Sequence, residues 1–388
     1  MQTKKLYYEN SYIKDFIAEV LSCEEFDNKY KVILDKTAFF PEGGGQKPDL
    51  GSIGDAVVTD VQEVDGTVFH FLNKPLNIGE FYDCSIDWDI RFRRMQEHSG
   101  EHIVSGIVHG IYGYENVGFH MDEDYVTVDF NGELNREQLD DIEERANKAV
   151  YADYDIKCWF PDEKELNFLN YRSKLELTEN VRLVEIENTD LCACCAPHLK
   201  RTGEVGIIKI LDFMRHRGGV RIVIKSGLDA LRDYRKKYKS VYDVSGLLSA
   251  KQDEIASSVE RVQGELDCVK RDFYNFKIGV AQNDKENITI KGECAYFISS
   301  CHDADMMREL ANYGMLNHKL CLVFSGTDGE GYSYIIGSNE LDMKKVASLI
   351  NTSLNGRGGG RGTMIQGKIS ADKSKIIDLI ENLDVGAI

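Results

Sequence analysis

Two pairs of metal-ligating residue types, repeated with the same spacing, constrain the fold of this chain more than any other feature. His98 and His102 lie four residues apart, and so do Cys194 and His198. On a helix this spacing is about one turn, so both side chains of a pair reach one ion at about 2.0–2.3 Å. If both pairs bind the same ion, the fold must bring two distant segments together around it.

The four residue types suit zinc in softness and in number. One such pair alone is often incidental, and the second pair strengthens the interpretation. Cys192 or Cys195 could replace Cys194, although only Cys194 has the four-residue spacing to His198. We therefore predict one Zn²⁺ per chain, held by the two pairs. Four protein ligands close a structural site, whereas catalysis needs an exchangeable position, and both readings stay open at this stage.

Composition indicates a soluble globular protein of more than one domain. The 388 residues exceed one ordinary core. No segment approaches the roughly 18 apolar residues needed to cross a membrane, and the N-terminus lacks the apolar run of a signal peptide, so we expect a cytoplasmic protein. A net charge of −18 argues against broad coating of nucleic acid, and any such contact must come from local basic patches.

The pattern of the chain predicts an α+β, multidomain fold in four parts. Residues 1–87 contain short β-branched runs separated by turn residues, which favours a small β-barrel. Residues 88–226 mix two helices with strands and hold both metal pairs, which indicates a zinc-binding α+β domain. Residues 227–278 are helical, as a hairpin or coiled-coil linker. Residues 279–388 again mix strand and helix.

The helical part carries an apolar seam. We predict a break at Ser245-Gly246 and a capping box of Ser249 and Gln252 before the second helix. Apolar residues then alternate steps of four and three over three heptads, the pattern of a coiled coil: Ile255, Val259, Val262, Leu266, Val269, Phe273 and Phe276. An amphipathic helix packed on its own domain, a helical hairpin, or a homodimer through residues 250–277 would each produce this pattern.

Four landmarks occur in order over about the first 225 residues: the glycine-rich residues 39–46, the two metal pairs, and residues 202–206. This series resembles the editing domain of alanyl-tRNA synthetase and its free-standing relatives, the AlaX proteins. The glycine- and arginine-rich residues 356–362, with residues 366–368, resemble the DHHA1 domain at the C-terminus of the synthetase. The whole is similar to the long AlaX form. That form has no aminoacylation domain, so we expect neither tRNA charging nor ATP binding.

The resemblance implies a zinc-dependent aminoacyl-tRNA deacylase. Its substrate would be alanine tRNA carrying serine, or glycine, and its reaction the hydrolysis of the aminoacyl ester. Glu101, beside His102, is the candidate base; the alternative is a solvated helix-face acid. Thr37 is the candidate partner of the serine hydroxyl, by resemblance, and otherwise an ordinary strand threonine.

Further residues are candidates for binding substrate or tRNA. Gly43, Gly44 and Gly45 would allow close backbone approach, and Gln46 would contact the terminal nucleotide. His120, in the segment after the HxxxH helix, is another candidate for substrate binding. For the tRNA body the candidates are Arg357, Arg361 and Lys368, together with residues 200–225, which hold seven Lys and Arg against two acids.

One departure and two rival functions accompany these expectations. Cys195-Ala196-Pro197 replaces the glycines and threonine that the family carries inside its CxxxH pair, and proline lacks a backbone donor. One rival is a non-catalytic tRNA-binding protein with a structural zinc. The other is a zinc hydrolase acting on a small molecule. A DHHA1 phosphoesterase would need an Asp-His-His metal domain, which has no counterpart here.

Overall fold

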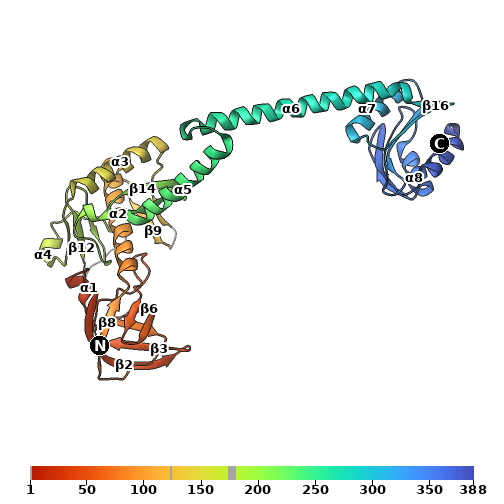
Figure 1. Cartoon of the computed structure of the whole chain (residues 1–388). Helices are drawn as coiled ribbons and strands as arrows, with labels where there is room; N and C mark the ends of the chain where they lie inside the picture. Colours follow the sequence, from red (N-terminus) through yellow and green to blue (C-terminus); the bar gives the residue numbers. More distant parts are fainter. Residues whose placement is uncertain (1, 123–124, 174–180) are drawn as a thin grey trace. The chain divides into compact units, whose positions relative to one another are not determined.

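The computed structural model describes residues 2–122, 125–173 and 181–388, and the chain divides into two compact units, Met1–Tyr242 and Asp243–Ile388 (Figure 1). Helices and strands occur in both units, which confirms the α+β, multidomain class. The finer division into four parts stays a prediction. Among the described residues, no helix combines the length and the apolar character needed to span a membrane.

Six antiparallel strands of the first unit close into a small barrel, hydrogen-bonded in the order β2-β3-β7-β6-β5-β8. The strands are β2 (Asp15–Phe26), β3 (Lys29–Leu34), β5 (Gly51–Ile53), β6 (Ala56–Val64), β7 (Thr67–Leu72) and β8 (Phe81–Ile86). Asp27 and Asn28 turn β2 into β3 with φ of 49° and 60°, and Asp65 and Gly66 turn β6 into β7 with φ of 49° and 78°. Positive φ at both central residues is the hairpin geometry that matches strand twist.

A short segment and a glycine-rich loop lie beside the barrel. The strands β1 (Lys4–Lys5) and β4 (Lys36–Thr37) pair in parallel, and α1 (Leu6–Glu9) follows β1 directly. The glycine-rich residues 39–46 come next after β4. Gly43 and Gln46 exchange backbone hydrogen bonds of 3.1 and 3.0 Å there, which closes the loop into a tight turn.

The central helix α2 (Trp88–Tyr112) carries the HxxxH pair. It begins where the Asp87 side chain accepts a hydrogen bond from the Ile90 N–H, and it ends at Gly113 in the left-handed conformation. Glycines let its middle pack closely. A Cβ at Gly100 would lie 2.3 Å from Ser226 Oγ, and one at Gly106 would lie 2.4 Å from the Thr189 carbonyl.

Two antiparallel sheets surround α2. The larger has the order β14-β15-β10-β9 and the smaller β11-β12-β13. Their strands are β9 (Asn116–Met121), β10 (Val126–Phe130), β11 (Ile156–Trp159), β12 (Leu183–Ile186), β13 (Asp190–Ala193), β14 (Ile208–His216) and β15 (Gly219–Ser226). The helices beside them are α3 (Arg136–Ala152), α4 (Glu163–Leu166) and the 3₁₀ turn η1 (Thr202–Val205). Asn135 and Gln138 form the capping box of α3. Met95, Phe130, Leu139 and Ile222 belong to the shared core.

The second unit is a six-stranded sheet, ordered β16-β17-β18-β19-β21-β20, with helices. The strands are β16 (Thr289–Lys291), β17 (Cys294–Ser299), β18 (Leu320–Thr327), β19 (Gly331–Gly337), β20 (Gly356–Gly359) and β21 (Met364–Ile369). The helices are α6 (Ile255–Asn283), α7 (Ala304–Met315), α8 (Met343–Ser353) and α9 (Lys373–Glu381), with 3₁₀ turns η2 (Gln252–Glu254), η3 (Asp284–Asn287) and η4 (Val385–Ala387). Successive residues of β18 face opposite sides: Leu322 packs with α8 and α9, and Val323 packs with α7.

The predicted helix break is wrong in position. α5 (Gly227–Leu248) continues through Ser245 and Gly246. It ends at Ser249, whose φ is 50° and whose N–H donates to the Gly246 carbonyl. Ser249 is therefore the left-handed residue that closes α5. It does not cap the next helix, because neither η2 nor α6 has a side-chain cap.

Candidate metal centre

The structure brings the four predicted ligands together. His98 and His102 come from α2, and Cys194 and His198 from the loop after β13. Their ligand atoms all lie within 4.8 Å of one another. Cys194 Sγ is 3.5 Å from His98 Nε2 and 3.3 Å from His198 Nε2. A tetrahedral zinc with bonds of about 2.0 Å to nitrogen and 2.3 Å to sulfur requires nitrogen–sulfur separations of about 3.5 Å, so the donor set fits this ion.

The orientation of the three imidazoles supports the same conclusion. On each ring, Nδ1 lies within hydrogen-bond distance of an oxygen, which leaves Nε2 for an ion. The pairs are His98 with Gln46 Oε1 at 2.9 Å, His102 with Asp190 Oδ2 at 3.0 Å, and His198 with Ser99 Oγ at 3.1 Å. Such outer partners fix the tautomer and the ring plane of metal-binding histidines.

Asp190 has a second partner in Arg172. The Arg172 guanidinium donates to Asp190 Oδ1 at 2.8 Å and to Oδ2 at 2.7 Å. Burial alone would raise the pKa of Asp190, but the hydrogen bonds from His102 and Arg172 outweigh it and hold the pKa below its ordinary value. Asp190 is therefore an ionised carboxylate behind a ligand ring. Neither Asp190 nor Arg172 could be predicted from the sequence, because an isolated acid in a strand and an arginine before it form no motif.

Burial sets the protonation of two ligands. It lowers the pKa of His198 well below its ordinary value, so this imidazole is neutral, as metal binding requires. Burial also raises the pKa of Cys194 well above that of a free thiol. In the absence of a cation, the Cys194 thiol keeps its proton.

A cavity of about 370 Å³ opens beside this centre. The residues that line it are Tyr8, Gly44, His98, Glu101, His102, Asn116, Phe160, Arg172, Ser173, Arg182, Cys192, Ala193, Cys194 and Cys195. Arg182 also fixes the loop that contains Cys195-Ala196-Pro197, the segment that departs from the family pattern. Its guanidinium donates to the carbonyls of Cys194 and Ala196 at 2.9 and 2.8 Å. The loop therefore keeps a defined shape despite Pro197.

Glu101 lies in this cavity and is not the solvated acid of the alternative reading. Its residue is only 4% exposed. Its Oε1 accepts hydrogen bonds from Ser105 Oγ and Asn116 Nδ2, and its Oε2 lies 4.0 Å from His102 Nε2. One oxygen is thus held by neighbours while the other lies near the ligand atoms.

Thr37 is not brought to the cavity. Its side chain is fully buried in the first unit, where Oγ1 lies 2.8 Å from His70 Nε2 and accepts from the Phe39 N–H at 3.1 Å. Among the described residues that line the cavity, Thr37 does not occur. The predicted contact with a serine hydroxyl is therefore not supported by this arrangement, because the hydroxyl is already used inside the unit.

The glycine-rich loop packs against the metal centre, and its residues make other contacts than the predicted ones. Gly44 lines the cavity. Gly45 has φ of 81°, and a Cβ there would lie 2.6 Å from the Phe119 carbonyl, so only glycine fits against β9. Gln46 is 1% exposed and contacts His98, which excludes the predicted contact with a nucleotide in this conformation.

His120 lies apart from the cavity. It is exposed on β9 and is absent from the described lining residues. Its neighbour Phe119 is the residue that reaches the centre, with its ring centroid 4.8 Å from that of His98. Alternation along the strand thus turns Phe119 inward and His120 outward.

The basic residues of 200–225 carry less net charge than their number suggests. Four of the seven form ion pairs: Arg201 with Asp153 and Asp155, Lys209 with Glu143, Arg215 with Glu133, and Arg221 with Asp129. In the second unit, by contrast, Arg357 lies opposite Lys368 in the β20–β21 pair, and Arg361 lies in the connection between these strands. All three side chains are exposed.

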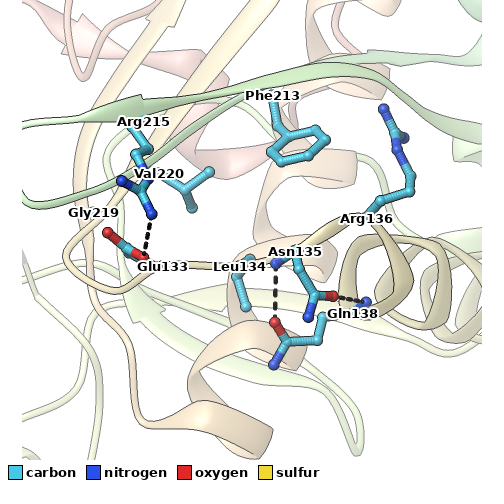
Figure 2. A pocket seen from close by; sticks show the side chains of 9 residues that line it. All are labelled: Glu133, Leu134, Asn135, Arg136, Gln138, Phe213, Arg215, Gly219 and Val220. Atoms are coloured by element: carbon cyan, nitrogen blue, oxygen red, sulfur yellow. Dashed lines mark hydrogen bonds and ion pairs between the residues drawn. The ribbon is translucent and has the colours of Figure 1, made fainter.

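A second pocket of the first unit lies at the start of α3 (Figure 2). Its volume is about 400 Å³. Figure 2 shows Arg215 directed to Glu133, 3.5 Å away, and the Arg136 guanidinium lies 4.9 Å from the centre of the Phe213 ring. Of the predicted site residues, the basic segment 200–225 reaches this pocket through Arg215, whose charge is paired with Glu133. None of the residues predicted to bind the metal or the aminoacyl group is among the described residues that line it, so the metal centre remains the candidate site.

Family models match two segments of the chain. Residues 2–90 match "tRNA synthetases class II (A)", and residues 181–263 match "Threonyl and Alanyl tRNA synthetase second additional domain". With the metal centre, these matches define a relative of the class II tRNA synthetases and their additional domains.

The relatives specify the class further. The alanyl-tRNA editing protein AlaX-L of Pyrococcus horikoshii is 26% identical over 407 residues, which cover 97% of each chain. The alanine–tRNA ligase of Ignicoccus hospitalis is 27% identical over 394 residues, which cover 98% of this chain and 43% of the ligase. The chain thus spans less than half of the ligase and nearly all of AlaX-L. It is an AlaX-type protein.

One solved structure matches a smaller part of this chain. The C-Ala domain of Aquifex aeolicus alanyl-tRNA synthetase matches with 22% sequence identity, covering 24% of this chain and 95% of that domain. Its TM-score is 0.21, too low to support a statement about fold. The DHHA1-like character of the second unit therefore stays a prediction.

Proposed function

We propose that the chain is a trans-editing hydrolase that removes serine, or glycine, from alanine tRNA. The observation that carries the proposal is the group of three buried imidazoles and one partly buried thiol, with the Glu101 carboxylate beside it, at a cavity of about 370 Å³. The similarity to AlaX-L over 97% of both chains supports this substrate, since that relative is named an alanyl-tRNA editing protein.

The residues of the cavity would have separate roles in ester hydrolysis. Zinc, held by His98, His102, Cys194 and His198, would supply a Lewis acid for the ester carbonyl or a bound water. Glu101 Oε2 accepts the proton of the attacking water and returns it to the ribose oxygen as the carbon–oxygen bond breaks. Ser105 and Asn116 hold the other oxygen, Oε1, and so orient the carboxylate.

Recognition of the amino acid falls to the groups that line the cavity. With Thr37 engaged by His70, the partner of a serine hydroxyl must come from the lining residues, among which Arg182 and Cys195 are polar and adjacent to the ligand loop. A cavity that hydrogen-bonds this hydroxyl discriminates against alanine by up to about 10⁴-fold.

The partners in this proposal are mischarged alanine tRNA and a second copy of the chain. Arg357, Arg361 and Lys368 form an exposed basic hairpin in the second unit, suited to phosphate contacts. The second copy would bind through residues 250–277. Work on aminoacyl-tRNA during translation would place the protein in the cytoplasm.

A second candidate, a tRNA-binding protein with a structural zinc, is favoured by one observation. The centre offers four protein ligands, which is the closed set of structural sites. Deacylation assays with seryl-, glycyl- and alanyl-tRNA for alanine separate the two functions, with Cys194→Ala/His198→Ala as the control. Release of serine or glycine by the wild type alone, with alanine spared, supports editing. Tight tRNA binding with intact esters supports the rival.

A further inference from the structure

Three tyrosines form a row on the outer side of α5. Tyr234, Tyr238 and Tyr242 are spaced by four residues, so each lies about one turn beyond the last on the same side of the helix. Their exposed fractions are 64%, 49% and 63%. The rings of Tyr234 and Tyr238 are stacked, with centroids 6.1 Å apart and planes at 26°. This tyrosine row therefore presents flat aromatic surface to a partner.

Basic side chains accompany the tyrosine row. Residues 230–242 hold five Lys and Arg against one acid, in a chain whose net charge is −18. Arg235 and Lys239 directly follow the first two tyrosines, and both are exposed. Their spacing repeats that of the tyrosines, so about 6 Å of helix separates the two residues. α5 thus carries a local positive patch beside its aromatic rings.

The charges of Arg235 and Lys239 are available to a partner. The nearby Lys237 already contacts Asp233 at 2.7 Å. Within the part of the chain that the structure describes, neither Arg235 nor Lys239 has an ion pair. An unpaired cation keeps its full attraction for an anion, and at physiological salt this attraction extends about 8 Å. Both side chains are therefore suited to bind phosphate.

The start of α5 is fixed to the helix that carries the histidine pair. A Cβ at Gly227, where φ is 59°, would lie 2.4 Å from the Gln96 side chain, and Asp229 contacts Arg93 of α2 at 2.8 Å. Gln96 precedes His98 by two residues, so it lies about 200° around α2 from that ligand. The tyrosine row therefore belongs to the same compact unit as the metal centre, Met1–Tyr242, and its helix begins on the other side of α2.

RNA is the partner that this combination of side chains fits. Unpaired bases stack on aromatic rings with little regard to sequence, and Lys and Arg bind the phosphates that join them. Leu228 and Leu231 of α5 are also exposed, at 56% and 39%. An apolar protein surface would cover leucines and tyrosines alike, but it would gain nothing from cations that alternate with the rings. The charge pattern therefore favours RNA.

We propose that the outer side of α5 binds the acceptor end of the tRNA, with unpaired bases on the tyrosine row and phosphates at Arg235 and Lys239. The inference rests on the proposed function, which makes tRNA the substrate. The ester that reaches the metal centre lies at the 3′ end of the tRNA, so the RNA nearest to this unit is the acceptor end. The contact is distinct from the basic hairpin of the second unit.

Loss of the aromatic rings tests the stacking. The probes are two uncharged acceptor-stem hairpins, one with the unpaired 3′ strand of alanine tRNA and one without it, and binding is followed by fluorescence anisotropy. Tyr234→Leu/Tyr238→Leu should weaken binding of the first hairpin about 10- to 100-fold and leave the second unchanged. Tyr234→Phe/Tyr238→Phe is the matched control and should bind as the wild type does, because phenylalanine stacks equally well. Wild-type binding by the leucine variant would overturn the proposal, since leucine keeps an apolar contact but not a stacked base.

Loss of the charges tests the phosphate contacts. For Arg235→Ala/Lys239→Ala, the slope of log K against log salt concentration should fall by about 1.4, because each phosphate bound in a single strand contributes about 0.7. Lys236→Ala/Lys237→Ala removes the same charge from other sides of α5 and should keep the wild-type slope. Equal slopes in the two variants would refute the assigned contacts.

Two further measurements separate this inference from the proposed function. Circular dichroism verifies that α5 persists in each variant. Seryl-tRNA deacylation by the wild type reports on the hydrolase: tRNA bound through α5 with its ester intact would refute the hydrolase alone. Active deacylation with unchanged hairpin binding in both α5 variants would refute the contact alone.

Discussion

The carboxylate of Asp190 lies 3.0 Å from Nδ1 of His102, and this contact turns Nε2 of the ring to the other three ligands. His102 lies in α2 and Asp190 in β13, so this contact links the helix to the strand and also fixes the orientation of a metal ligand. Burial favours the protonated form, but the hydrogen bonds from His102 and Arg172 hold the pKa of this carboxyl below its ordinary value. The metal centre therefore consists of the ligands themselves and of the side chains that hold the ligand rings in place. Only the ligands form a recognisable sequence motif.

Asp190→Asn should weaken metal binding about 10- to 100-fold. The amide can still accept from His102, but it loses the charge and leaves the Arg172 guanidinium without its carboxylate. Competition with a chromogenic chelator measures the affinity, and Asp140→Asn, on the exposed side of α3, is the matched control. Unchanged zinc affinity in Asp190→Asn would mean that the contact does not tune the centre.

Glu101→Gln should lower the deacylation rate by about 10²–10⁴-fold, because an amide cannot accept the proton of water. Its zinc content should stay at one per chain, which elemental analysis measures. Glu144→Gln, at an exposed position of α3, serves as the control. Near-normal turnover with full zinc would remove the base role from Glu101.

Thr37→Val should destabilise the protein by about 1–3 kcal/mol, since it leaves the buried Nε2 of His70 without its partner. Removal of serine and of glycine should change by the same factor, as the hydroxyl does not reach the cavity. Denaturant unfolding and parallel deacylation assays measure the two effects. A loss confined to serine would return Thr37 to the role that the sequence resemblance implied.

Low pH should lower the free energy of unfolding of the first unit, because His70 is buried there in its neutral form. Burial lowers the pKa of His70 from 6.5 to about 4, so the folded unit favours the neutral ring. Its contribution to stability is complete above pH 6.5 and is lost as the pH falls towards 4, because the unfolded chain gains the proton first; the full loss is about 3 kcal/mol. His70→Gln should show a smaller change in unfolding free energy between pH 7 and pH 4.5. Equal changes in both proteins would assign the acid sensitivity to other groups.

The sequence predicts best the features that repeat. Spacing identified His98, His102, Cys194 and His198, and the structure gathers them at one point. The turn residues between the β-branched runs include Asp-Asn and Asp-Gly, which tolerate the positive φ that the β2–β3 and β6–β7 turns require. In each case a local rule acts on neighbouring residues, so no knowledge of tertiary contacts is needed.

Features that depend on tertiary contacts escaped prediction. The loop sequence alone makes Gln46 a candidate for ligand binding, and only the approach of α2 shows that its side chain contacts His98. Thr37 sits in a strand of two residues, too short for alternation to reveal which way its side chain points. Ser249 resembles an N-cap by residue type, but the left-handed backbone makes it the end of α5.

We propose that the histidine–cysteine centre drives hydrolysis of mischarged alanine tRNA. The most direct test titrates zinc into metal-free protein and follows the release of serine from seryl-tRNA for alanine. We predict that the rate rises in proportion to bound zinc and saturates at one ion per chain, while Cys194→Ala/His198→Ala stays inactive. Turnover that is the same with and without zinc, or no turnover at full occupancy, would contradict a catalytic role of the centre.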